Sequence, residues 1–317
     1  MTIMKNFIPL YEERTFGDKL SATFDFIKFN FRFWLMSCVY LLLPLSLVQA
    51  LALNGYMGGI MGGALADGLS SDSSYMSMGI SYIGYIFFFS VGSLLLSSLM
   101  YAMMRYYREN DGNFEGVTLK DLSGLLKKNF WRGFRVGLLL TGLFILACSL
   151  VILAGVPIAL LQIPALAAVL FVLFLAAAIA VCVPLALTMP VCMLEDGNTA
   201  FGAIRRGFRL GWNTWGGTFV VILLIGLIVN VIQSAVALPW YIALMAKAVL
   251  TEDNSAAEIV QSGWYNFLYY ILAVVQTFGS YLAMSVMVTA LGYQYGSAAE
   301  KMDSISVDDD IENFESI

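Results

Sequence analysis

The sequence predicts an all-α fold in which six helices cross a membrane. Three observations lead to this prediction: 60% of the 317 residues are hydrophobic, only 12% are charged, and the mean hydropathy is +0.80. Soluble domains carry about 25% charged residues. A chain with half that density has too few polar groups to cover a water-exposed surface of this size. The composition therefore predicts an integral membrane protein.

A helix needs about 20 apolar residues to cross a bilayer. Six stretches are long enough: 33–53, 80–104, 134–156, 164–188, 215–238 and 264–292. The third and fourth stretches meet at "PIALLQIP", where Pro157 and Pro164 predict a tight hairpin rather than one long helix. The first 20 residues contain neither an uninterrupted apolar core nor a small-residue cleavage site, so we expect no signal peptide.

A cytoplasmic interfacial helix is predicted before spans one, three and five. Apolar residues recur there at steps of three and four, which places one apolar stripe on each of three segments: 15–31, 118–132 and 199–212. Capping residues are expected at their N-termini: Thr15 with Asp18, Thr118 with Asp121, and Asn198 or Thr199. An Asn marks each join with a span: Asn30, Asn129 and Asn213. The recurrence predicts a threefold pseudo-repeat of interfacial helix, span, outer loop and returning span.

The orientation follows from the placement of Lys and Arg. Of these 17 residues, only Lys247 falls on the side of the loops 54–79 and 239–263. Cytoplasmic loops carry the excess of basic residues, so we expect both termini in the cytoplasm. The chain then forms one membrane domain over 1–296 and a cytoplasmic tail over 297–317. From Glu300 onward there are seven acidic residues and one Lys, which predicts a disordered tail that could meet a protein partner.

The basic residues of the interfacial helices are candidates for binding anionic lipid headgroups, where each contributes about 1 kcal/mol near the surface. They are Lys19, Lys28, Arg32, Lys127, Lys128, Arg132, Arg205, Arg206 and Arg209. The alternative is that they only orient and brace the spans. A nucleic-acid partner is not expected, because the apolar stripe beside each basic patch needs the bilayer.

No span core contains Asp, Glu, Lys or Arg, although ion-coupled carriers usually place such groups inside the membrane. The intramembrane candidates are amides: Asn230, Gln233 and Gln276. Two interpretations stay open. These side chains either bond neighbouring helices to one another or line a cavity for a substrate.

The chain has no His, which excludes His-based metal sites, His general bases and Ser-His triads. Its four Cys lie in apolar runs without metal-type spacing, so we expect free thiols. The remaining chemical candidates are Glu195 and Asp196, which could act as acid and base or hold a metal. The alternative is a structural role, in which they pair with Arg205, Arg206 and Arg209 and with the N-terminus of the following helix. We expect no cofactor and no enzymatic activity.

The segment from Pro190 to Asn213 contains Glu195, then Ala203-Ile204, Arg206-Gly207 and Leu210. It resembles a pattern of bacterial six-helix inner-membrane proteins of unknown function, which also occurs in the membrane domain attached to some glycerophosphodiester phosphodiesterases. The N-terminal "RTFGDKLSATFDFIKFNF" is similar to the usual beginning of that group. Gly207 departs from the pattern, which has Ser there. The resemblance implies the fold and the inner membrane but no phosphodiesterase activity, because that catalytic barrel is a separate domain of about 250 residues.

The leading hypothesis is a non-enzymatic inner-membrane protein with a structural or accessory role, whose interfacial helices engage lipid headgroups. The first alternative is a permease for a small or amphipathic solute that uses the face of Asn230, Gln233 and Gln276. The second is an enzyme at the membrane interface that uses Glu195 and Asp196.

Overall fold

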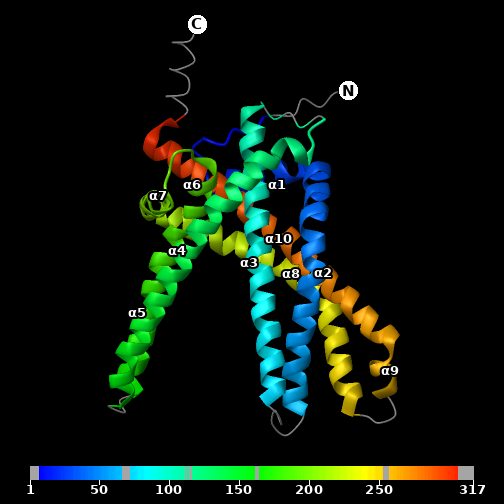
Figure 1. The fold of residues 1–317 in the computed structure, drawn as a ribbon. Helices are drawn as coiled ribbons and strands as arrows, with labels where there is room; N and C mark the ends of the chain where they lie inside the picture. The colour runs from blue at the N-terminus through cyan, green and yellow to red at the C-terminus, as the bar shows by residue number, and fades with distance from the viewer. Residues whose placement is uncertain are drawn as a thin grey trace. The chain divides into compact units, whose positions relative to one another are not determined.

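The computed structural model describes residues 7–65, 72–110, 112, 114, 116–160, 164–252 and 257–305. Within those ranges every regular element is a helix, as the sequence predicts (Figure 1). Six helical stretches are long and apolar enough to cross a membrane: Phe31–Ile60, Tyr75–Glu109, Leu119–Leu153, Ala168–Leu194, Trp215–Leu250 and Gly263–Asp303. The all-α fold and the number of candidate spans are thereby confirmed.

The helices are α1 (Phe16–Phe29), α2 (Phe31–Leu65), α3 (Asp72–Glu109), α4 (Leu119–Leu160), α5 (Pro164–Leu185), α6 (Thr188–Leu194), α7 (Ala200–Asn213), α8 (Trp215–Glu252), α9 (Ala257–Gln261) and α10 (Gly263–Asp303). The predicted caps are present. The Asp18 carboxylate accepts from the Thr15 backbone N–H at 3.2 Å, and the Asp121 carboxylate accepts from that of Thr118 at 2.8 Å. At α7 the cap is Thr199, whose hydroxyl accepts from the Gly202 N–H at 3.1 Å.

The second predicted interfacial helix does not exist as a separate element. The first segment ends at a turn on Asn30 and the third ends before Thr214, whereas α4 runs without a break from Leu119 to Leu160. No proline interrupts the chain between Leu119 and Val156, so nothing forces the backbone to leave the helix. The prediction of a helix 118–132 followed by a distinct span is therefore wrong. Asn129 is not a cap but a buried residue inside α4.

The boundaries of the fourth and sixth spans also differ from the prediction. The chain leaves α5 at Ala186 and Leu187 and re-enters a helix as α6, because Pro190 has no N–H to donate to the Ala186 carbonyl. At the C-terminus, α10 extends to Asp303, and Ser297, Ala298 and Ala299 are buried. The tail therefore does not begin at residue 297, and residues 306–317 lie outside the described residues.

The structure divides into two compact units, which are described separately. Unit 1 comprises Met1–Phe29, Ser98–Ile225 and Val288–Ile317, and so contains α1 and α4 to α7 with parts of α3, α8 and α10. Within it α4 and α5 lie side by side (Figure 1). Helix α7 packs on the junction of α5 and α6 through glycines. A Cβ on Gly207 would lie 2.6 Å from the Thr188 Cα, and one on Gly211 would lie 2.5 Å from the Pro184 Cα.

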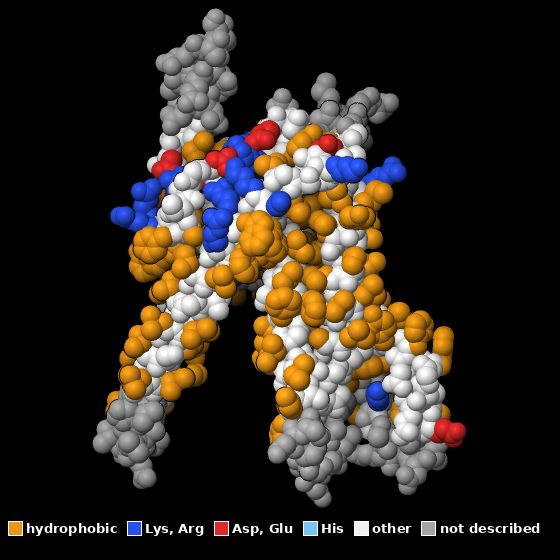
Figure 2. All heavy atoms as spheres, viewed as in Figure 1, with side chains coloured by type: hydrophobic (Ala, Val, Ile, Leu, Met, Phe, Trp, Pro, Cys, Tyr) orange, Lys and Arg blue, Asp and Glu red, His pale blue; other side chains and the backbone are white. Residues whose placement is uncertain are grey.

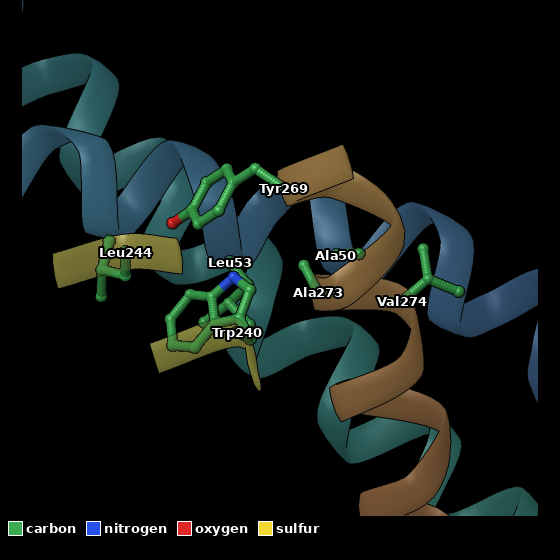
Figure 3. Close-up of a cluster of buried hydrophobic side chains, with 7 residues drawn as sticks. All are labelled: Ala50, Leu53, Trp240, Leu244, Tyr269, Ala273 and Val274. Atoms are coloured by element: carbon green, nitrogen blue, oxygen red, sulfur yellow. The ribbon is translucent and has the colours of Figure 1, made fainter. Parts of the chain in front are cut away.

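Unit 2 comprises Asn30–Ser97 and Gly226–Met287, which is all of α2, most of α3, the second part of α8, α9 and the first part of α10. Figure 3 shows its core, in which side chains of α2, α8 and α10 meet. Trp240 is 1% exposed there, and its indole N–H donates to the Asn54 side chain at 3.1 Å. In the same unit the Tyr281 hydroxyl donates to the Gln49 side chain at 2.6 Å. Polar groups within the spans thus bond neighbouring helices to one another.

Candidate functional site

The most highly connected polar site in the described chain lies in the loop between α6 and α7. Glu195 ends α6 in an extended conformation, and Gly197 follows at φ +82°, a left-handed backbone that favours glycine. This turn directs the carboxylates of Glu195 and Asp196 toward other helices of unit 1. Figure 2 shows Lys and Arg side chains gathered beside Asp and Glu side chains where α4, α6 and α7 meet.

Asp196 accepts from three cations of two helices. Its carboxylate oxygens lie 2.7 Å from an Arg105 nitrogen on α3, 2.6 Å from the Lys128 ammonium and 3.2 Å from an Arg132 nitrogen on α4. The hydrogen bond from Arg105, followed by that from Lys128, holds the pKa of Asp196 well below its usual value. A carboxylate held this way is a weak base. Its arrangement suits an ion-pair junction better than proton transfer.

Glu195 joins two further helices to this junction. Its carboxylate accepts from Arg206 of α7 at 2.6 Å and from the Tyr295 hydroxyl of α10 at 2.7 Å. Its backbone carbonyl accepts from Arg132 at 2.6 Å. Arg206 also donates to Asp303 near the end of α10 at 2.8 Å. Burial opposes the charged form of Arg206, yet the carboxylate beside it raises the Arg206 pKa above the usual value.

The structure thus separates the predicted basic residues into two sets. Lys128, Arg132 and Arg206 form ion pairs with Asp196 or Glu195, although Lys128 is still 48% exposed, and Arg209 lies 3.9 Å from Asp303. In the part of the chain that the structure describes, no hydrogen bond or ion pair is formed by four exposed side chains: Lys28, Arg32, Lys127 and Arg205. Lys19 belongs to neither set, because it is buried.

The predicted pairing of the two acids with the Arg residues of α7 is right for Arg206 alone. Arg209 faces Asp303, and Arg205 does not reach either acid. The most important partner that the sequence did not reveal is Arg105, which lies 91 residues before Asp196. Its position at one end of a predicted span was evident from the sequence, but nothing in the local pattern links it to Asp196.

The intramembrane amides differ in their hydrogen-bond partners. Asn230 donates to the Gly226 carbonyl of its own helix at 2.9 Å, whereas Gln233 donates across to the Ser280 carbonyl of α10 at 3.3 Å. The side-chain oxygen of Gln276 is buried and has no hydrogen-bond partner among the described atoms. The interhelical interpretation therefore holds for Gln233.

Among the described residues, no group of three or more His, Cys, Asp or Glu side chains could hold a metal ion. Glu195 and Asp196 lie side by side but face different cations, so they do not converge on one point. Their geometry fits a junction that holds α3, α4, α7 and α10 together.

The fold defines a polytopic, all-α membrane protein. Comparison with known proteins finds no family model that matches the chain, no matching curated protein and no matching solved structure. The resemblance of residues 190–213 to six-helix inner-membrane proteins stays a prediction.

Proposed function

We propose that the protein is a non-enzymatic component of a bacterial inner membrane, with both termini in the cytoplasm, and that its cytoplasmic basic segments engage anionic lipid headgroups. One observation supports this proposal above others. Three of the exposed cations without a partner in the described chain each have an exposed aromatic side chain four residues away on the same helix.

These pairs are Lys28 with Phe24 on α1, Lys127 with Trp131 on α4, and Arg205 with Phe201 on α7. The aromatic side chains are 40%, 50% and 72% exposed. Residues four apart lie on the same helix face. Each pair therefore presents a charge and a ring together, as expected of side chains at the depth of lipid headgroups, where an aromatic ring is most stable.

Helix α7 supports the proposal in most detail. Ala203, Ile204, Gly207, Leu210 and Gly211 are buried on the face toward α5 and α6. A second stripe, spaced by four, three and four residues, consists of Phe201, Arg205, Phe208 and Trp212. Phe201 and Trp212 are 72% and 54% exposed. Phe208 is half-buried, but the rings at both ends of this stripe are left exposed, so a lipid surface suits them. Ile204, three residues after Phe201, packs inside the protein instead.

The two alternatives have no such support. A permease would use Asn230, Gln233 and Gln276 to bind solute, but the first two donate to backbone carbonyls, which leaves the buried Gln276 oxygen alone without a partner among the described atoms. An interfacial enzyme would use Glu195 and Asp196, but both are engaged with cations.

The experiment compares single variants in nanodiscs that contain phosphatidylcholine and a fraction of spin-labelled phosphatidylglycerol. Lys28→Gln, Lys127→Gln and Arg205→Gln should each weaken association of the anionic lipid by about 1 kcal/mol, roughly fivefold. The matched control is Lys120→Gln, because Lys120 is equally exposed on α4 but has Gly116 and Gly124 at the positions four residues away. An equal effect of all four substitutions, or no effect of any, would contradict the proposal.

A further inference from the structure

A polar cavity of about 460 Å³ lies in unit 1, apart from the junction at Glu195 and Asp196. Its wall is formed by the chain before and within α1, the join of α7 and α8, and the last turns of α10. Three cations and one carboxylate line it: Arg14, Lys19, Lys301 and Glu13. Cavities of this size are ordinary for small-ligand sites.

Lys19 is the unusual member of this lining. It is only 9% exposed, and its ammonium has no hydrogen-bond or ion-pair partner among the described residues. Burial, together with the nearby charges of Arg14 and Lys301, lowers the pKa of Lys19. The ammonium is not among the fully buried atoms, so the cavity reaches it, and an unpaired charge on so buried a side chain favours an anion beside it.

The other two cations of the lining do not supply an anion for Lys19. Arg14 is already engaged with the Glu12 carboxylate at 2.5 Å and with the Pro9 carbonyl at 2.6 Å. Lys301 is exposed and forms no ion pair within the described chain. The cavity therefore holds two ammonium groups that form no ion pair within the described chain, beside the one carboxylate of Glu13.

A buried amide supplies the second feature. Gln294 lines the cavity at 1% exposure, and its amide nitrogen donates to the Thr218 hydroxyl at 2.9 Å. Its side-chain oxygen has no donor among the described atoms. Buried polar atoms are normally hydrogen-bonded, so this oxygen suits a ligand that brings a hydroxyl or ammonium donor. The first turn of α8 also lines the cavity at Gly216 and Gly217, where helix N-termini favour anions.

We propose that this cavity binds a phosphate group that carries a hydroxyl or ammonium substituent, with Lys19 as its counter-ion, Lys301 as a second cation and Gln294 as an acceptor for the substituent. A bare phosphate would leave most of the 460 Å³ unfilled. Both a soluble phosphate ester and a phospholipid headgroup have this chemistry. The inference does not rest on the proposed function, because Lys19 is buried and is not one of the exposed cations.

The test is isothermal titration of the full-length protein in a neutral detergent at low salt with three probes: inorganic phosphate, glycerol phosphate and short-chain phosphatidylglycerol. Glycerol phosphate or phosphatidylglycerol should bind wild type, and Lys19→Met should weaken that binding at least tenfold. The matched control Lys120→Met, an exposed cation outside the cavity, should stay within twofold. Binding of glycerol phosphate identifies a soluble ester, and binding of phosphatidylglycerol alone identifies a headgroup.

Heat stability without ligand separates a binding role of Lys19 from a purely structural one. Because Lys19→Met removes an unpaired charge from a mostly buried position, the proposal predicts a variant that is more heat-stable than wild type but binds ligand less well. A purely structural role predicts a variant that is less heat-stable. If Lys19→Met does not fold, Lys301→Met should still weaken binding several-fold. Failure of wild type to bind any probe, or binding by both variants as tight as that of wild type, overturns the inference.

Discussion

The contact of α7 with α5 and α6 depends on two glycines, and replacing both with alanine should separate the helices. An added Cβ would lie 2.5 Å from the Pro184 backbone at Gly211 and 2.6 Å from the Thr188 backbone at Gly207, whereas ordinary Cβ contacts are 3.4 Å or longer. Neither neighbour is a flexible side chain that could turn away. The helix must therefore move outward by roughly 1 Å to restore normal contact.

The energetic terms have opposite signs. Overpacking costs about 1–3 kcal/mol at each site, while alanine gains about 1 kcal/mol over glycine in a helix. The double variant Gly207→Ala, Gly211→Ala should lose about 2 kcal/mol of stability. Arg206 directly precedes Gly207 on α7, so the same movement should lengthen its 2.6 Å bond to Glu195 beyond hydrogen-bonding distance.

The assay is thermal unfolding in detergent, and the reaction of a maleimide dye with Cys192 monitors the unfolding. This thiol of α6 is 3% exposed, so it reacts only when the contact opens. Cys38, Cys148 and Cys182 are replaced beforehand. Gly124→Ala is the control, because a Cβ there meets nothing within 4 Å and should leave stability unchanged or raise it. A double variant that unfolds at or above the wild-type temperature would refute the reasoning.

Three further predictions concern single side chains. Asp196→Asn should lower the free energy of unfolding, and with it the unfolding temperature. The loss should be no more than about 1 kcal/mol per lost ion pair, because this site is half-exposed. A carboxylate whose pKa is depressed stabilises the fold above its unfolded pKa and loses that effect as pH falls through the lower folded value. The difference from wild type should therefore be constant from about pH 5 to 8, and a titration within that window would contradict it. Asn129→Leu should stabilise α4 by about 1 kcal/mol or more, because both amide atoms of this 1%-exposed side chain lack partners among the described residues. A loss of stability would show that the Asn129 amide forms a stabilising polar contact. Tyr281→Phe should lower the free energy of chemical unfolding by about 1–3 kcal/mol, because it leaves the Gln49 oxygen without its donor. Tyr40→Phe, at a 75%-exposed position, should leave that free energy unchanged. Equal effects of the two substitutions would argue against the Gln49 bond.

The helix caps could be predicted from the sequence because a cap depends only on residues close together in the chain. A Thr and an Asp three residues apart suffice to predict the N-termini at Thr15 and Thr118, and both are present. The threefold repeat was less readable, because biased composition makes apolar segments look alike. The Asn that marks a turn at position 30 is buried inside a continuous helix at position 129.

The basic residues show the same limit. Their concentration on one side of the spans was evident, but the sequence could not show that Lys128 and Arg132 pair with Asp196 while Lys127 has no partner in the described chain. Neighbours along a helix point about 100° apart, so the choice depends on which face meets the loop after α6. The burial of Lys19 in a cavity depends likewise on the packing of α10 and the α7–α8 join beside it.

By itself, the sequence determined the class of protein and the number of candidate spans, because the thickness of a bilayer and its lack of hydrogen-bonding groups impose helix length and apolar composition directly on the chain. The tertiary structure alone decided which charges are paired and which have no partner in the described chain. Asp196 meets Lys128 from 68 residues away and Arg105 from 91, and Arg206 meets Asp303 from 97. Contacts over such separations are set by how helices pack, and no local pattern in the sequence records them.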